Sequence, residues 1–480
     1  PLAEAMYLKL PLITTGWGGQ IDFCSDETSW LVDYKFSYAS THFDLASSTW
    51  AEPSVEHLAS QMHKVYSLEE DEVKVKTDAA YKKISLFTWD SVADININFA
   101  NNFSKSQRFS YPRVGVITTY NSACGIANYT KSLFFSNQDF HAIFAPYDEK
   151  ILEDDEDNVY RCWNLCSSNF DELFSEIISK RITTIVISFN FGLYHFRELA
   201  KLLNKLFEVN INVIIIFHST IEPYGLKEKR LEILLPVLNK CTRLLVHTPE
   251  DMNRLKDQGL IENVTLFPHG ITDYESKVKR RNLRSDILYI ATNGFCLPDK
   301  GFLELLEAVS IIRRKGLKIH LNMLTAIHSS PISSEFSNLL KNKIIELNLE
   351  KNVVINLDYI PLDNILDELS MADLVIYPYQ QSNEASSAAV RNGLSSLTNV
   401  LVSPLPVFND VLQYVDVLNG NAPEDIASWI FSNYSRLINS RNNKDKNLEK
   451  KLNWKQELSF SKLGFRFQNM VRSLEINSKY

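Results

Sequence analysis

Two segments of this chain could bind a phosphate group, and each stands where a helix is expected to begin. Gly125 and Ile126 follow an apolar strand, and backbone N–H groups at such a helix start can approach an anion that the helix dipole attracts. Lys300 stands at the start of another expected helix, where a lysine opposes the dipole unless an anion binds beside it. Lys300 is therefore the best phosphate candidate. The alternatives are a tight turn at Gly125 and an exposed charge at Lys300.

Glu384 and His218 could bind hydroxyl groups. Glu384 lies in a loop before a helix of small residues; small residues let a ligand approach, and a carboxylate can accept hydrogen bonds from two hydroxyls. His218 ends the apolar strand 213–217, where its ring would face a cleft as a hydrogen-bond donor. The alternatives are a capping or surface acid at position 384 and a structural histidine at position 218. His269, between a proline and a glycine, indicates a turn.

Parallel strands are needed to position these residues, because ligands bind beyond the carboxyl ends of the strands in open α/β sheets. Short apolar strands alternate with helix-length amphipathic segments, and the pattern restarts after a basic linker at 277–284. This alternation predicts two Rossmann-like lobes with parallel sheets, joined near residue 280. We assign residues 106–280 to the first lobe, 281–450 to the second and 451–480 to a closing helix. The predicted strands are 114–118, 185–187, 213–217, 244–246, 287–290, 319–321, 353–355, 374–376 and 400–402. No Gly-x-Gly-x-x-Gly motif follows the first strand, which argues against a dinucleotide-binding dehydrogenase.

The beginning of the chain resembles a segment near its other end. When residues 3–15 are laid on residues 391–403, Glu4 falls on Asn392, and both copies run on to a tryptophan in a late helix, Trp89 and Trp454. A helix is predicted over 54–66, followed by a charged stretch, 69–76, that leads into the helix around Trp89. The repeat predicts that residues 1–105 are the C-terminal part of one domain, followed by a whole domain of the same kind.

Composition narrows the function classes. The 480 residues are 45% apolar and carry a formal net charge of −8, so they can form at least two cores and offer no basic field for nucleic acid. The chain lacks a run of roughly 18 apolar residues, the length that a membrane-spanning helix requires. Six cysteines without a Cys-x-x-Cys pair argue against zinc and disulfides and favour a reducing cytoplasm. The acidic run 154–157 and the run 439–451 are expected to be solvated loops.

Taken in order along the chain, several of these segments resemble glycosyltransferase family 4, retaining nucleotide-sugar enzymes with the GT-B fold. The resemblance covers about residues 112–475, and the order of the motifs is more specific than any one of them. The opening segment around Glu4 looks like the second half of the family's Glu-x7-Glu element. The segments are Gly125 to Tyr129, Phe191 to Leu193, Phe217 to Ser219, Val246 to Thr248, Phe267 to Gly270, Pro298 to Gly301 and the loop that holds Glu384.

The resemblance implies roles for the candidate residues. Lys300 and the backbone near Gly125 would hold the donor diphosphate, Glu384 would contact the transferred sugar, and His218 would orient the donor sugar or the acceptor. Asn392 stands where the family has a ribose-binding glutamate, and an amide binds hydroxyls without charge assistance. Glu4 would bind the ribose in the partner domain.

Three further positions bear on the same comparison. Phe295 stands where many members of the family carry an arginine, so Lys300 is the single cation for the diphosphate unless Arg391 contributes. Asn190 stands near a position where related sequences often have an acidic residue. The chemistry on the acceptor side would therefore differ from that of those sequences. No side chain stands out as a covalent nucleophile.

The resemblance thus implies a retaining transferase of a hexose, mannose by analogy, from a nucleotide diphosphate sugar to an oligosaccharide or lipid-linked glycan of surface polysaccharide or O-antigen. We expect no metal or other cofactor, a cytoplasmic location with peripheral association at the inner face of the membrane, and an upstream transferase domain as partner. Because of Asn392 and Phe295, a non-catalytic glycan-binding or scaffolding domain is the alternative. A GT-B epimerase is disfavoured because its sites usually need more acid and base side chains.

Overall fold

The computed structural model describes residues 1–41, 47–105, 112–134, 140–275, 286–328, 330–439 and 448–477. The chain divides into two compact units, Pro1–Tyr111 and Pro112–Tyr480. None of the described helices is long and apolar enough to span a lipid bilayer.

The first unit combines a short parallel strand pair, a hairpin and four helices. Strand β1 pairs in parallel with β2, while β3 and β4 form an antiparallel hairpin that the sequence pattern did not predict. Helix α3 packs on α1 around a small apolar core that contains Met6, Leu12 and Ile84. The elements are α1 (Leu2–Tyr7), β1 (Ile13–Thr15), β2 (Trp30–Val32), β3 (Tyr34–Tyr38), β4 (Thr49–Pro53), α2 (Val55–Ser67), α3 (Glu70–Ile84) and α4 (Trp89–Lys105).

One expectation for this region was wrong. The charged stretch 69–76 is not a linker but opens a helix, because Glu69 and Glu72 form a capping box at the start of α3. Trp89 lies in a helix, as expected, but its surroundings differ from those of Trp454. Trp89 begins α4 and is 89% exposed, whereas Trp454 lies in α15 (Leu448–Glu457), is 4% exposed and packs on Tyr414 at a ring-centroid distance of 4.5 Å.

Lobe 1 of the second unit, residues 112–275, is built on a seven-stranded sheet in which every pair is parallel, with the order β11-β10-β9-β8-β5-β6-β7. Its central strands β5, β8 and β9 are rich in Val and Ile and are buried on both faces along almost their whole length. The strands are β5 (Val114–Ile117), β6 (Phe140–Pro146), β7 (Val159–Trp163), β8 (Thr184–Phe189), β9 (Asn212–Phe217), β10 (Arg243–Val246) and β11 (Val264–Leu266). The helices are α5 (Gly125–Phe134), α6 (Asp171–Ser179), α7 (Phe196–Glu208), α8 (Leu235–Leu238) and α9 (Pro249–Asp257).

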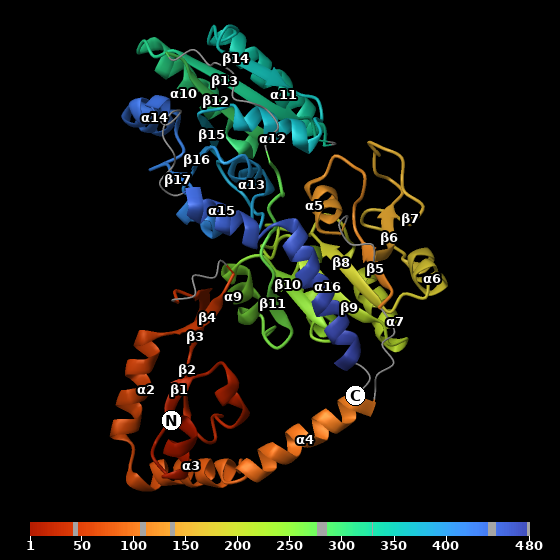
Figure 1. Ribbon diagram of the computed structural model, residues 1–480, viewed down its shortest axis with the longest axis vertical. Helices are drawn as coiled ribbons and strands as arrows, with labels where there is room; N and C mark the ends of the chain where they lie inside the picture. Colours follow the sequence, from red (N-terminus) through yellow and green to blue (C-terminus); the bar gives the residue numbers. More distant parts are fainter. Residues whose placement is uncertain are drawn as a thin grey trace. The chain divides into compact units, whose positions relative to one another are not determined.

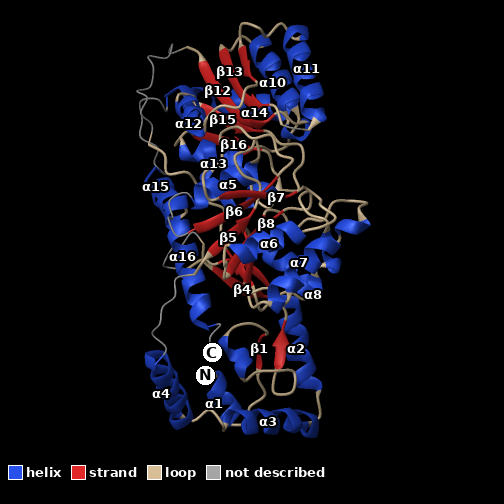
Figure 2. Ribbon diagram, turned by 90° about the vertical axis from the view of Figure 1, so that its right-hand side faces the viewer, coloured by secondary structure: helices blue, strands red, loops and turns tan. Residues whose placement is uncertain are grey.

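Lobe 2, residues 286–439, has a six-stranded parallel sheet with the order β14-β13-β12-β15-β16-β17. Helices flank the strands of both sheets (Figure 2). The strands are β12 (Leu288–Phe295), β13 (Ile319–Ala326), β14 (Val353–Asn356), β15 (Leu374–Tyr377), β16 (Asn399–Val402) and β17 (Asp416–Val417). The helices are α10 (Phe302–Arg314), α11 (Pro331–Glu346), α12 (Leu362–Ser370), α13 (Ala388–Ser395) and α14 (Pro423–Asn439). The predicted α/β class with two parallel-sheet lobes is confirmed.

The last helix, α16 (Phe460–Asn477), returns to lobe 1 (Figure 1). Its residues Leu463, Phe467 and Val471 share one apolar core with Val114 and Leu133 of lobe 1. The backbone at its start is fixed by a hydrogen bond from Phe460 N to Ile271 O of 3.0 Å. Lobe 1 is therefore completed by a segment that follows lobe 2 in the chain.

Candidate functional site

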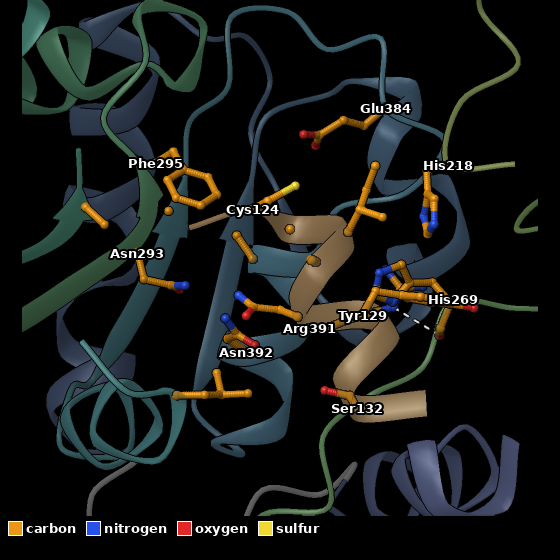
Figure 3. A pocket seen from close by; sticks show the side chains of 18 of the residues that line it. Cys124, Tyr129, Ser132, His218, His269, Asn293, Phe295, Glu384, Arg391 and Asn392 are labelled. Atoms are coloured by element: carbon orange, nitrogen blue, oxygen red, sulfur yellow. Dashed lines mark hydrogen bonds between the residues drawn. The ribbon is translucent and has the colours of Figure 1, made fainter. Parts of the chain in front are cut away.

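A cavity of about 510 Å³ lies between the two lobes, a volume typical of a small-molecule site. Six of the seven candidate residues line it: Gly125, Ile126, His218, Lys300, Glu384 and Asn392. The seventh, Glu4, lies on α1 of the first unit with its side chain 76% exposed. Tyr129, His218 and His269 gather on one side of the cavity, opposite Asn293 and Phe295 of lobe 2 (Figure 3).

Helix α5 presents an open backbone at its start. A Cβ built on Gly125 would meet no atom within 4 Å, so the protein's own packing does not require a glycine there, and its absent side chain leaves the first N–H groups accessible. The preceding loop is anchored by Glu149, whose carboxylate accepts from Ser122 Oγ at 2.6 Å and from Tyr120 N at 3.1 Å.

The acidic run beside this loop is not simply solvated as expected. Asp155 accepts from Arg161 Nε at 2.7 Å and from Asn121 Nδ2 at 3.1 Å, which links the run to β7 and to the loop before α5. Of the second run, 440–447 lie outside the described residues.

Lys300 is a buried cation, not the exposed charge that was its alternative. It is 6% exposed, and its Nζ lies 4.1 Å from the centroid of the Tyr379 ring and 3.5 Å from Glu384 Oε2. Burial alone would lower the pKa of Lys300, but Tyr379, Glu384 and Asp299 outweigh it and raise that pKa above its usual value. The ammonium group is therefore charged and faces a ligand-sized cavity.

Glu384 lies in the loop between β15 and α13, and its side chain is 53% exposed. The backbone of this loop contacts lobe 1, because Ala385 N donates to His218 O at 3.2 Å and Ser219 Oγ donates to Asn383 O at 2.6 Å. Asn392 follows on α13 and is half-buried. The loop thus brings a carboxylate and an amide to the cavity, close to His218.

Arg391 is already compensated and is not a second free cation. It forms an ion pair with Asp410, and both side chains are buried, at 3% and 4% exposed. Its Nε also donates to His269 O at 3.2 Å and its Nη1 to Ser386 Oγ at 2.6 Å. The guanidinium therefore holds the two lobes together, and Lys300 remains the cation available to a ligand among the described cavity residues.

Three histidines from the ends of β9, β10 and β11 meet around Tyr129. The ring of Tyr129 lies 4.8 Å from that of His218, 5.5 Å from that of His247 and 5.0 Å from that of His269. Burial lowers the pKa of each imidazole, and for His218 and His269 the pKa falls well below the usual value. All three rings are therefore neutral near pH 7.

Several polar atoms of this cluster lack a partner. His247 Nδ1 lies 2.9 Å from Phe267 O and donates to it, which leaves Nε2 as a bare acceptor. Within the described part of the chain, that Nε2, Tyr129 Oη and His218 Nε2 are buried without a hydrogen-bond partner. Sequence reasoning placed Tyr129, His247 and His269 in segments that carry the resemblance, but it assigned no role to the side chains of Tyr129 and His247 and otherwise interpreted His269 as part of a turn.

Asn293 is a further site residue that the sequence did not single out. It is 3% exposed, its Oδ1 accepts from Tyr377 Oη at 2.6 Å, and it lines the cavity. Beside it, Phe295 packs edge-on against His328 at 5.2 Å. Position at the carboxyl end of a strand was the available signal, since β12 ends at Phe295.

The lobe 1 side of the cavity has no charged side chain among the described lining residues. Asn190 Oδ1 accepts from Gly192 N at 2.9 Å, which fixes the amide at the end of β8. Tyr359 Oη of lobe 2 donates to Asn128 Oδ1 of α5 at 2.9 Å. No group of three or more His, Cys, Asp or Glu side chains suited to a metal ion occurs among the described residues.

Comparisons with known proteins bear on the fold. No protein-family model matches the chain, and no curated protein sequence matches it. Solved structures do match. Sucrose-phosphate synthase from Thermosynechococcus elongatus is 12% identical with a TM-score of 0.57, over 76% of this chain and 99% of that one. An α,α-trehalose-phosphate synthase (UDP-forming) from Burkholderia xenovorans, in complex with glucose-6-phosphate, is 10% identical with a TM-score of 0.57, over 76% and 100%. Anabaena Alr3699/HepE in complex with UDP and glucose is 10% identical with a TM-score of 0.59, over 76% and 100%. The chain has the GT-B fold of these proteins.

Proposed function

We propose that the second unit is a glycosyltransferase that moves a hexose from a nucleotide diphosphate sugar to a hydroxyl of a growing glycan. The observation that carries the proposal is Lys300, a buried and charged ammonium group in a cavity that the open start of α5 also lines. A buried cation with one carboxylate at 3.5 Å suits a ligand that brings further negative charge.

The chemistry follows from the placement of these groups. As the bond between the sugar and the diphosphate breaks, Lys300 and the first N–H groups of α5 stabilise the negative charge that develops on the leaving group. Glu384 accepts hydrogen bonds from hydroxyls of the transferred sugar, and His218 orients that sugar. Asn392 binds ribose hydroxyls with the weaker bonds of an amide.

The finer assignments rest on the resemblance to glycosyltransferase family 4. We propose retention of the anomeric configuration, mannose as the sugar, and a lipid-linked or oligosaccharide acceptor in surface polysaccharide or O-antigen synthesis, on the cytoplasmic side of the membrane. Lys300 supplies the positive charge, so no metal or other cofactor is expected. The related structures support the donor class, since one holds UDP and glucose and another is described as UDP-forming.

The domain assignment belongs to the same proposal. Residues 1–105 form the end of a first transferase domain, 106–280 and 281–450 form the two lobes of a second, and 451–480 form its closing helix. The order α1, β1, β2 in the first unit parallels the order α13, β16, β17 in lobe 2, with parallel pairing in both. Glu4 on α1 then takes the place that Asn392 has on α13.

Calorimetry with a panel of nucleoside diphosphates tests the donor site. We expect micromolar binding of one base, weakened at least tenfold by Lys300→Ala, because the substitution removes the cation that faces the cavity. Lys318→Ala is the matched control: this lysine is 66% exposed in an ion pair with Asp286, and its loss should leave the affinity unchanged.

The other outcomes select the alternatives. Absence of binding to every nucleotide would reject the donor site and favour a non-catalytic glycan-binding or scaffolding domain, the interpretation that Asn392 and Phe295 support. Conversion of the donor sugar without any acceptor would identify an epimerase instead.

A further inference from the structure

Fixed positive charge in the cavity is confined to lobe 2. Among the described residues that line the cavity, only Lys300 and Arg391 carry a permanent positive charge. Arg391 forms a buried ion pair with Asp410, and the carboxylate of Asp410 neutralises its charge. Lys300 alone faces the ligand, and on the proposed function it is committed to the donor diphosphate.

The wall that lobe 1 contributes has no charged side chain among the described residues. Its hydrogen-bonding side chains include Asn128 and Ser132 on α5 and Asn190 after β8. The Asn190 oxygen is occupied by Gly192 N at 2.9 Å, which leaves the NH₂ group of that amide as a donor. Amides and hydroxyls of this kind complement the hydroxyls of a ligand and offer no counter-charge to an anion.

The histidine cluster behind this wall is also neutral. Neutral His247 has a bare Nε2 acceptor, and the Tyr129 hydroxyl next to it has no partner within the described residues. Both atoms are buried, so the cluster adds no charge to the lobe 1 side of the cavity. The neutrality of these rings is secured by burial.

An acidic loop runs alongside the same wall. Residues 148–157 contain seven Asp and Glu residues and one lysine. The loop is held against the start of the cavity wall by a hydrogen bond from Leu152 N to Asn121 O of 2.7 Å and by a bridge between Ser122 and Ile151. Arg161 and Lys131 compensate only part of its charge, through Asp155 and Glu153. Lys300 and the start of α5 offset this potential for the donor diphosphate, but the remaining negative potential disfavours a second anion on lobe 1.

We propose that the acceptor that docks on lobe 1 is uncharged where it enters the cavity: a neutral sugar residue of a glycan, with no phosphate or carboxylate close to the reacting hydroxyl. An anionic group there would lose its hydration without gaining a partner of opposite charge, beside a loop of like charge. The inference rests on the proposed function, because it assigns Lys300 to the donor.

Matched ligand pairs test the inference. The full chain, saturated with the nucleoside diphosphate that calorimetry identifies, is titrated with hexoses and with the corresponding hexose 6-phosphates. Saturation-transfer difference NMR is the measurement because it detects millimolar binding. We expect the neutral member of a pair to bind at least tenfold more tightly than its phosphate. Equal or tighter binding of the phosphate would overturn the inference, and so would binding of neither member of any pair.

Two variants make the test independent of which hexose is used. Ser132→Lys adds a cation to the lobe 1 wall on a half-buried helix position and should raise the affinity for the 6-phosphate at least fivefold. Asn204→Lys adds the same charge on the exposed face of α7 and should change neither affinity. If both variants act alike, the wall does not select by local charge.

The outcomes separate this inference from the proposed function. Absence of nucleotide binding to the unmodified protein would reject the donor site around Lys300 and, with it, the proposed function. Nucleotide binding together with preference for an anionic acceptor leaves the donor site intact and rejects only the neutral wall.

Discussion

The hydroxyl groups of Tyr129 and Tyr377 are both buried, but they differ in their partners. Tyr377 donates to Asn293 Oδ1 at 2.6 Å, whereas Tyr129 Oη has no partner within the described part of the chain. A buried hydroxyl without a partner reduces stability, while a paired one contributes to it. At the scale of single residues, the cluster around Tyr129 therefore sacrifices some stability, as binding sites often do.

Phenylalanine substitutions at the two positions should separate these cases. We expect Tyr377→Phe to lower the free energy of unfolding by about 1–3 kcal/mol, since it leaves Asn293 unpaired. Tyr129→Phe should leave it unchanged or raise it by up to about 1 kcal/mol, while weakening sugar binding. Urea denaturation measures the stability of both variants. A comparable loss in Tyr129→Phe would show that its hydroxyl is paired in solution.

At the scale of elements, the turn between Lys300 and α10 depends on Gly301. Its φ is 72°, and a Cβ at this position would lie 1.8 Å from the carbonyl oxygen of Pro378. The close approach of the two backbones brings the lysine beside the loop after β15. The glycine is therefore needed for both backbone conformation and space.

Gly316 provides a comparison in which only the backbone conformation matters. Its φ is 89°, and a Cβ there would meet no atom within 4 Å. Gly316→Ala should cost about 1–2 kcal/mol, the strain of a left-handed alanine. Gly301→Ala should cost more than about 3 kcal/mol, because a backbone clash adds to that strain. Urea denaturation of the two variants decides the point, and equal losses would contradict the structure around Pro378.

Elements with a strong local pattern were predictable, and the others were not. Runs such as 185–187 and 213–217 are apolar throughout, which marks a strand buried on both faces. Strands β6, β7 and β11 escaped prediction because polar residues such as His141, Arg161 and Thr265 interrupt them, and neighbouring strands decide their pairing. The spacing of Glu69 and Glu72 could have predicted the capping box of α3. The many charged residues around it instead suggested a segment outside any helix.

The site divides in the same way. Lys300 and Glu384 could be found because their segments carry a recognisable order of residues along the chain. Tyr129 and His247 lie in segments of the same order, but the role of their side chains could not be predicted, because it depends on the contact between α5 and the end of β10. The compensation of Arg391 by Asp410 depends on a segment 19 positions away, which no local pattern reveals.

At the scale of the whole molecule, every residue that lines the cavity belongs to the second unit, from Cys124 to Phe460. The cores of both lobes also lie within that unit. We therefore expect a protein of residues 112–480 to fold alone and to bind the nucleoside diphosphate with an affinity within about threefold of that of the full chain, a difference below ~0.7 kcal/mol.

Calorimetry and circular dichroism on both proteins check this expectation. A folded 112–480 protein that has lost nucleotide binding would show that the first unit contributes to the donor site. If the 112–480 protein is unfolded, the second unit depends on the first unit for its stability.

The return of α16 to lobe 1 sets an order of events during synthesis. Strand β5 and helix α5 emerge from the ribosome early, but the apolar side chains that cover them, including Phe460 and Phe467, follow more than three hundred residues later. At about 5–20 residues per second this interval lasts roughly 15–65 s. Throughout it, the nascent lobe 1 exposes the apolar surface around Leu133 and Phe267 to chaperones and to neighbouring chains. Lobe 2 can complete its own core first, so the part of the molecule translated second reaches its final packing before the part translated first.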